Sequence, residues 1–371
     1  GSFLVLVGSR AFQAVGASMI AAIGPAMVTA YLPMEQKGKA MGIVLTFTSV
    51  GTMLGPALGG LLCQYLSWNW IFYVNVPVGI IATLLGAKVI PEEAPVQRRG
   101  GFDRAGAALI VVGLASLLFA LSEGETLGWT SLPIIAASGI AILSLGGFVA
   151  CELRARDPLL QLRLFARKNF LVTNAIIALI FFCYGGINYL LPFYLEYVRG
   201  HDPFTAGLIL TSLSVSGMIA GLLAGMLYNR TGGRLLCIIA GISLAFGFLL
   251  LTLLRAETPT PFVILSLLFI GFGIGLMLTP ATTMIMNSVA HRYQGMVSSV
   301  TIVERFAPMS VGIALFNLVF VMGVSQIAID KGITGTAPAN IRVEALVGGF
   351  DLAFFFAFLV GILILALAFI A

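Results

Sequence analysis

Long uninterrupted runs of apolar residues are the feature that most constrains how this chain can fold. A helix crosses the hydrocarbon core of a bilayer with about 20 apolar residues, and by that measure the chain carries about eleven runs. Their approximate bounds are 3–32, 40–66, 71–90, 105–122, 132–152, 169–197, 204–227, 235–254, 261–288, 296–325 and 349–371. Inside lipid no water can pair with the backbone, so each run must be helical. The sequence therefore predicts an all-α, polytopic membrane protein.

The composition agrees with a membrane location. Apolar residues make up 59% of the chain and charged residues 9%, whereas charged residues are about 25% of a soluble domain. The net charge is only +5, and no basic cluster stands apart from the apolar runs. We therefore expect a lipid bilayer as the surrounding partner and no nucleic acid.

The cysteines and the missing catalytic motifs argue against a metal site or an enzyme. Single cysteines are scattered through the apolar runs without CxxC or Cys/His spacing, at Cys63, Cys151, Cys183 and Cys237. Neither a zinc site nor a disulfide framework is expected from this pattern. The sequence contains no Walker, HExxH or GxSxG motif, so we expect no enzymatic activity and no cofactor.

Lysine and arginine are divided unequally between alternate loops. One set of loops, with its flanks, holds fourteen of the twenty basic residues, and the other set holds four. Basic residues are retained on the cytoplasmic side of a membrane. The loops near Arg98 and Arg163 are thus expected inside the cell and the loop near Lys331 outside, with the protein in the plasma membrane.

A stripe of glycines lies within the second apolar run. Gly51, Gly55 and Gly59 recur every four residues and so fall on one face of a helix. A face without side chains lets another helix pack backbone to backbone. Pro56 lacks an N–H and should bend the helix, and Gly60 ends the motif. We expect the stripe to be a close-packing face, so that a larger side chain at Gly55 would block the contact.

Five stretches, in order along the chain, match motifs of one transporter family. They are Arg10–Ala17, 51–60, Trp68–Pro77, Gly225–Arg234 and Gly271–Gly275. In this set the chain resembles the fourteen-helix drug:proton antiporter family of the major facilitator superfamily. The second stretch is similar to the antiporter signature G-x-x-x-G-P-x-x-G-G of the fifth helix, and the fourth to the inner-loop signature G-x-L-x-D-R-x-G-x-R. Asn69 and Asn229 stand where the family usually has Arg and Asp, which weakens any role based on those charges.

The resemblance implies a fold of two helical bundles of the major facilitator type. When the five stretches are aligned with the family's motifs, the chain is expected to lack the first three helices of the family. Residues 1–90 would form a partial N-terminal helical bundle, 91–168 two inserted central helices with cytoplasmic linkers, and 169–371 a C-terminal six-helix bundle. Transport would proceed by alternating access about a midplane site.

The function implied is secondary active export of small apolar or cationic compounds in exchange for protons, by a monomer. Two alternatives stay open. A transporter of a specific metabolite, such as an amino acid or a siderophore, would use the same fold. A membrane sensor or subunit that does not transport is favoured by the missing acid at Asn229.

Ionisable groups within apolar runs are candidates for proton coupling, since such groups cost about 2.5–3.5 kcal/mol each to insert. Arg10 and Gln13 lie in the first run and match the fourth-helix pattern of the family. Arg10 either faces the cavity or extends to the outer interface. Glu304 and Arg305 lie near mid-membrane in the tenth run. Glu304 either carries a proton or, with Arg305, takes part in structural salt bridges between helices.

Two further groups complete the candidate site. Phe181, Tyr184 and Asn188 share one face of the sixth run and would suit an apolar or cationic substrate, unless they are plain core packing. The predicted cytoplasmic gate loop consists of Gly225, Asn229, Arg230, Gly232 and Arg234.

Outside the candidate site, residues 152–168 alternate charged and apolar side chains. This pattern fits either an amphipathic helix on the inner membrane surface or a solvated connector. Glu196, His201 and Asp351 are expected to be wetted at the ends of their runs.

The orientation can be tested with the single-cysteine variants Arg98→Cys and Lys331→Cys, made in a background without the native cysteines. We expect a membrane-impermeant maleimide added to intact cells to label position 331 and to spare position 98, because of the unequal distribution of basic residues. Labelling of position 98 from outside, with position 331 protected, would reverse the topology.

Overall fold

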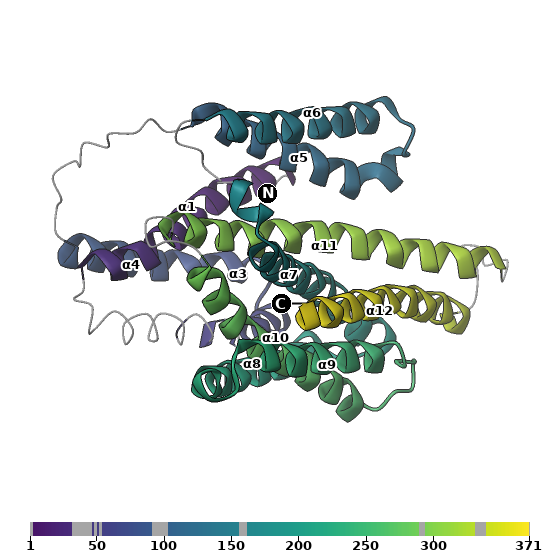
Figure 1. The fold of residues 1–371 in the computed structure, drawn as a ribbon. Coiled ribbons are helices and arrows are strands. Elements are labelled where there is room, and N and C mark those ends of the chain that lie inside the picture. Colours follow the sequence, from purple (N-terminus) through teal and green to yellow (C-terminus); the bar gives the residue numbers. More distant parts are fainter. Residues whose placement is uncertain are drawn as a thin grey trace.

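The structure is a computed structural model, and it describes residues 3–31, 47, 50–51, 54–90, 103–155, 162–288, 294–330 and 339–370. These residues are almost all helical, and no β-strand occurs among them (Figure 1). Nine of the described stretches are long and apolar enough to cross a bilayer. The prediction of an all-α, polytopic membrane protein is therefore confirmed. The loops near Arg98 and Lys331, and much of the run 40–66, lie outside the described residues.

The helices follow the predicted runs closely. Their bounds are α1 Phe3–Tyr31, α3 Trp70–Tyr73, α4 Asn75–Val89, α5 Arg104–Leu127, α6 Leu132–Arg154, η1 Leu162–Ala166, α7 Lys168–Phe193, η2 Tyr194–Val198, α8 Pro203–Thr231, α9 Gly233–Leu251, α10 Thr260–Asn287, α11 Gln294–Asp330 and α12 Ala339–Ile370. Residues 54–65 form a further helix between α1 and α3. The short η1 is a 3-10 helix and η2 is a π-helix that continues α7.

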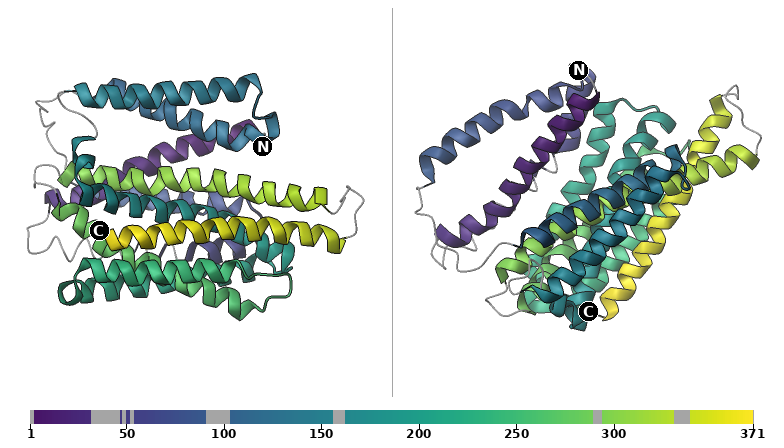
Figure 2. Two further views of the ribbon diagram at one scale, coloured as in Figure 1. Left: turned by 45° about the vertical axis from the view of Figure 1, so that its right-hand side comes forward. Right: turned by 90° about the horizontal axis from the view of Figure 1, so that it is seen from above.

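The six helices α7 to α12 pack into one bundle (Figure 1). Helix α7 runs through its middle, in contact with α10, α11 and α12, and carries a long series of buried residues. Large aromatic side chains fill the core where these helices meet, among them Tyr194, Phe248, Phe316 and Phe354, each at most 1% exposed. The helices of the first 90 residues lie to one side of this bundle (Figure 2).

Glycines let four of these helices approach backbone to backbone. A Cβ at Gly275 of α10 would collide with the carbonyl oxygen of Gly217 in α8, and one at Gly271 with that of Leu213. Helices α7 and α11 meet in the same way, at Gly185 and Gly312. Lipid tails are as apolar as leucine, so helices in a membrane associate through close packing of this kind.

Helices α5 and α6 pair as a hairpin, and α5 lies against α11 (Figure 1). The first turn of α5 is capped by Asp103, whose Oδ1 accepts a hydrogen bond of 2.8 Å from the Gly106 backbone N–H. The turn to α6 uses Gly128 at φ 88°, a conformation that favours glycine. The division into 1–90, 91–168 and 169–371 stays a prediction.

Several helices extend further than predicted, and in two of them the extension changes where a predicted residue lies. The expected gate loop begins at Gly225, but α8 continues to Thr231 and only Gly232, at φ 77°, separates it from α9. No breaker precedes Gly232, and Arg230 in the last turn suits the negative end of the helix dipole. Helix α12 begins at Ala339, so Asp351 lies three turns inside it and not at its start.

The amphipathic segment at 152–168 does not form one surface helix. Glu152 and Arg154 belong to the end of α6, and η1 follows as a separate turn. Leu164 of η1 is only 6% exposed and belongs to an apolar cluster with residues of α7 and α10. Leu164 therefore covers protein and not lipid.

The glycine contact between α8 and α10 predicts a sharp difference between two substitutions. Gly275→Val should destabilise the protein by about 1–3 kcal/mol or more, as overpacking does, because backbone atoms cannot give way. Gly139→Val in α6 is the control, since no described atom lies within 4 Å of a Cβ there. The measurement is the midpoint of thermal unfolding in detergent. Equal midpoints for the two variants would contradict the close contact.

Candidate functional site

Helices α7 and α11 bring together two groups of residues that the sequence singled out separately. The guanidinium carbon of Arg305 lies 5.6 Å from the centre of the Phe181 ring. Phe181 in turn contacts Tyr184 edge to face, with ring centres 6.2 Å apart. One turn further on, the Asn188 side-chain amide donates a 2.9 Å hydrogen bond to the Tyr184 carbonyl oxygen. The structure thus places a cation on an aromatic face in the interior of the bundle.

Glu304 directly precedes Arg305 on α11 and lies ten residues after Gln294. Its Oε2 atom is buried and has no hydrogen-bond partner among the described residues. The one salt bridge in the part of the chain that the structure describes joins Arg255 and Asp351. The alternative that Glu304 and Arg305 form salt bridges between helices is therefore not seen in these residues.

Arg10 and Gln13 lie on α1, away from this centre. The Arg10 guanidinium donates a 2.9 Å hydrogen bond to Gln13 Oε1 and lies 4.8 Å from the centre of the Phe72 ring. Both residues are exposed. The pair links α1 to α3 through a cation–π contact, and its role in coupling stays a prediction.

The glycine stripe contacts the C-terminal bundle through a face other than the expected one. A Cβ at Gly60 would collide with the Pro203 carbonyl oxygen of α8, and one at Gly207 with the Pro56 carbonyl oxygen. The Phe204 backbone N–H also donates a 3.2 Å hydrogen bond to Gln64 Oε1. The helix at 54–65 is therefore seated on the start of α8.

The expected stripe itself makes no such contact with the described residues. No described atom lies within 4 Å of a Cβ built at Gly51, Gly55 or Gly59. Successive residues point about 100° apart on a helix, so the face with Pro56 and Gly60 differs from the face with Gly55 and Gly59. Among the described residues no helix packs against this stripe, and its role as a close-packing face stays a prediction.

Arginines at the end of the bundle that is predicted to face the cytoplasm, called the inner end below, bind helix carbonyls. Arg234, at the start of α9, donates to the Phe369 carbonyl oxygen at the end of α12. Arg167 donates a 3.0 Å hydrogen bond to the Ser288 carbonyl oxygen just after α10. Arg230 is exposed, and the Asn229 side chain lies outside the described residues. These cations satisfy carbonyls that a helix end leaves unpaired.

The outer end of the bundle holds a polar cluster that the sequence analysis missed. Arg255 contacts both carboxylate oxygens of Asp351 at 2.6 Å, and its carbonyl oxygen accepts a 2.7 Å hydrogen bond from the Tyr194 hydroxyl. Arg199 donates to the Ala256 carbonyl oxygen, and the His201 ring lies 3.2 Å from the Thr260 hydroxyl. Asp351 is therefore paired and not simply wetted. The partners come from segments far apart in sequence, so no local pattern announces them.

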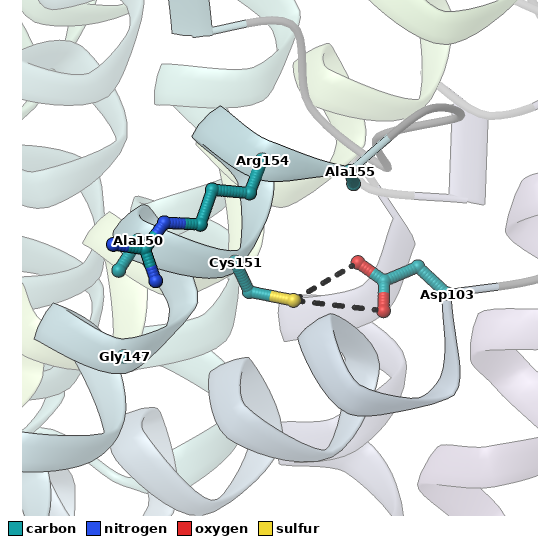
Figure 3. A pocket seen from close by; sticks show the side chains of 6 residues that line it. All are labelled: Asp103, Gly147, Ala150, Cys151, Arg154 and Ala155. Carbon is teal, nitrogen blue, oxygen red and sulfur yellow. Dashed lines mark hydrogen bonds between the residues drawn. The ribbon is translucent and has the colours of Figure 1, made fainter.

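A pocket of about 550 Å³ lies where α5 begins and α6 ends (Figure 3). The Asp103 carboxylate points at the Cys151 sulfur, 3.6 Å away, and the Arg154 side chain runs off on the other side of Cys151. Asp103 already caps α5. We infer that this junction has a structural role, which is to hold the start of α5 against the end of α6. A D-x-x-G pattern at 103–106 could have signalled the cap in advance.

Comparisons with known proteins identify the class to which this arrangement belongs. The family described as Major Facilitator Superfamily matches residues 1–313. The chain is 33% identical over 350 residues to the multidrug resistance protein Stp of Mycobacterium tuberculosis, covering 93% of this chain and 65% of Stp. It is 31% identical over 337 residues to the riboflavin transporter RibZ of Clostridioides difficile, covering 88% and 72%.

A solved structure agrees in fold. The crystal structure of an auto-inhibited POT family peptide transporter matches with a TM-score of 0.57 at 16% identity, covering 93% of this chain and 74% of that one.

The chain belongs to the Major Facilitator Superfamily. It is a multi-pass integral membrane protein of the plasma membrane, and its relatives include multidrug resistance transporters. The chain spans about two thirds of the length of Stp, 65%.

The seating of the 54–65 helix on α8 can be tested by cross-linking. Gln64→Cys and Phe204→Cys should form a cross-link in high yield, because the two residues share a hydrogen bond. Adding Gly60→Leu should lower the yield, since the new side chain meets the backbone of α8. Gly55→Leu is the matched control and should leave the yield unchanged. The opposite order of the two glycine variants would restore the original stripe as the contact face.

Proposed function

We propose that this protein exports small apolar or cationic compounds across the plasma membrane in exchange for protons, by alternating access and without an enzymatic step. The observation that carries the proposal is the centre between α7 and α11. There a buried carboxyl oxygen without a described partner lies one residue from a cation held on an aromatic ring. This combination offers a place for a proton and a place for an organic cation within one bundle.

The relatives support an exporter. Stp is named a multidrug resistance protein. A broad range of substrates fits a site that relies on aromatic faces, since these attract cations and apolar groups alike without demanding one shape. Phe181 and Tyr184 provide such faces on α7.

The contact between Arg305 and the Phe181 ring suggests that a cationic substrate and the Arg305 guanidinium compete for the same face of that ring. Arg305 lies over that ring. A cationic substrate that binds the same face must displace the guanidinium, and a displaced guanidinium changes the field at Glu304 on the same helix. An approaching positive charge favours loss of a proton from a carboxylic acid. Substrate binding and proton release are then coupled through electrostatic interactions.

The contact between the 54–65 helix and α8 is the second part of the proposal. Gly60, Pro56 and Gly207 let the two backbones touch without intervening side chains. A contact of this kind seals a passage to water, because no cavity remains between the helices. We propose that it closes one side of the transport path while the other is open.

A transporter of one metabolite is the second candidate. It is favoured by RibZ, which is named a riboflavin transporter and is 31% identical to this chain. A metabolite with a fixed set of polar groups would need hydrogen bonds that match those groups. Asn188 is the amide of the candidate site, and its side-chain nitrogen already donates to a carbonyl oxygen of its own helix.

Flux in proteoliposomes separates the two candidates. We expect an imposed pH gradient to drive movement of several unrelated organic cations, because an aromatic site is tolerant. Each cation should compete with the others. Movement of riboflavin alone, with cations neither transported nor inhibitory, would favour the second candidate. No counterflow of any of these compounds would exclude both.

Glu304→Gln tests the proton-carrying role within the same assay. The amide keeps the shape of the side chain but cannot carry a proton between the two sides. We therefore expect pH-driven accumulation to fall about tenfold or more, the order that general acid–base groups contribute. Movement of substrate down its own gradient should persist. Glu257→Gln in an exposed outer loop is the matched control. Full pH-driven flux in Glu304→Gln would remove Glu304 from the mechanism.

A further inference from the structure

The short helix η1 lies at the inner end of the bundle, across the ends of two helices that are distant in sequence. Leu164 forms one apolar cluster with Phe170 and Ile177 of α7 and with Ala281 and Ile285 of α10. Leu164 is 6% exposed and the other four are at most 2% exposed. A single turn of the connecting segment thus contributes Leu164 to the apolar cluster that α7 and α10 share.

Two further contacts hold η1 in place. The Phe165 ring meets the Phe170 ring edge to face, with centres 5.0 Å apart. Arg167, directly after η1, donates its 3.0 Å hydrogen bond to the Ser288 carbonyl oxygen beyond the end of α10. The segment is therefore fastened to α7 on one side and to α10 on the other, by a few contacts that can be released together.

Helix α7 also carries, near this turn, a buried polar side chain with an unpaired hydrogen-bond acceptor. Asn174 follows Phe170 by four residues and precedes Ile177 by three, so all three share one face of α7. Asn174 is 2% exposed, and its amide nitrogen donates a 2.6 Å hydrogen bond to the Phe170 carbonyl oxygen. Its Oδ1 atom has no hydrogen-bond partner among the described residues. Burying a hydrogen-bond acceptor without a donor is unfavourable. We therefore expect a second conformation of the protein in which Asn174 Oδ1 accepts a hydrogen bond.

The same face of α7 continues toward the membrane centre. Seven residues correspond to about two helical turns, so Phe181 lies above Asn174 on nearly the same line. The Asn174 amide therefore lies on α7 between Phe170, which clusters with Leu164 of η1, and the aromatic residues of the candidate site.

We propose that η1 is a strap that closes the cytoplasmic end of the path along α7, and that releasing it exposes Asn174 as a hydrogen-bonding group for entering substrate. The inference rests on the proposed transport function for its purpose. The closure itself can be measured without transport. In the released state Oδ1 of Asn174 accepts a hydrogen bond from water or from a donor group on the substrate. In the docked state the apolar cluster shuts both out.

The test measures the reaction of Asn174→Cys with a maleimide in nanodiscs, where both faces of the protein are accessible. The four native cysteines are first replaced by alanine. We expect slow labelling, and a rise of about tenfold or more when Leu164→Ser is added, the order expected when a buried leucine is lost from the closed state only. Arg167→Gln should give a smaller rise, and as an exposed substitution it keeps the test usable if Leu164→Ser fails to fold.

Leu171→Ser is the matched control. This leucine also lies near the inner end of α7, but it is 49% exposed, so its loss should leave labelling of position 174 unchanged. Lys168→Cys should react fast in every background. Fast labelling of position 174 with Leu164 intact would overturn the strap, as would folded Leu164→Ser and Arg167→Gln variants that label no faster.

A second measurement tests the gating role. A cross-link between Leu164→Cys and Ile285→Cys should stop substrate flux, and a reductant should restore it; because their Cα atoms lie more than 8 Å apart, the link is made with a reducible bifunctional thiol reagent and not as a direct disulfide. Flux that continues through the cross-linked protein would show that the strap does not gate. A protein without flux before cross-linking would refute the proposed function, and the labelling result would still decide whether the strap opens.

Discussion

Close contact between helix backbones is the constraint on which the rest of this structure depends. Helices in lipid gain little from burying apolar surface against one another, so their association relies on packing at short range. Gly185 and Gly312 bring α7 and α11 together, and Gly217 and Gly275 do so for α8 and α10. These two pairs set the geometry within which the candidate site lies.

The polar interior follows from the first of these contacts. Because α7 and α11 touch at Gly185 and Gly312, the residues one or two turns away on the two helices are held at short distance. Arg305 can reach the Phe181 ring from there, and Glu304 is buried beside it. Ionisable groups at this depth are costly. Their presence next to an aromatic face is the physical basis for proposing proton and substrate binding in one place.

The ends of the bundle are held by polar contacts of another kind. At the inner end Arg167 and Arg234 donate to carbonyls at helix ends, and at the outer end Arg199 donates to the Ala256 carbonyl in the loop between α9 and α10. Arg255 adds the ion pair with Asp351. Such contacts exchange readily with water, whereas the glycine contacts in the middle do not. A bundle with a rigid centre and exchangeable ends can open at one face while keeping its core.

The sequence by itself determined the class of fold and the order of the helices, because a bilayer leaves the backbone no alternative to helices of a set length. It also determined that Glu304, Arg305, Phe181 and Tyr184 were unusual enough to single out. Which face of a helix meets which neighbour was decided only by the tertiary structure. The contact at Gly60 in place of Gly55, the pairing of Asp351 with Arg255 and the clustering of Leu164 with Ala281 and Ile285 all join segments distant in sequence. Their energies depend on the orientation of whole helices, which no local pattern of residues specifies.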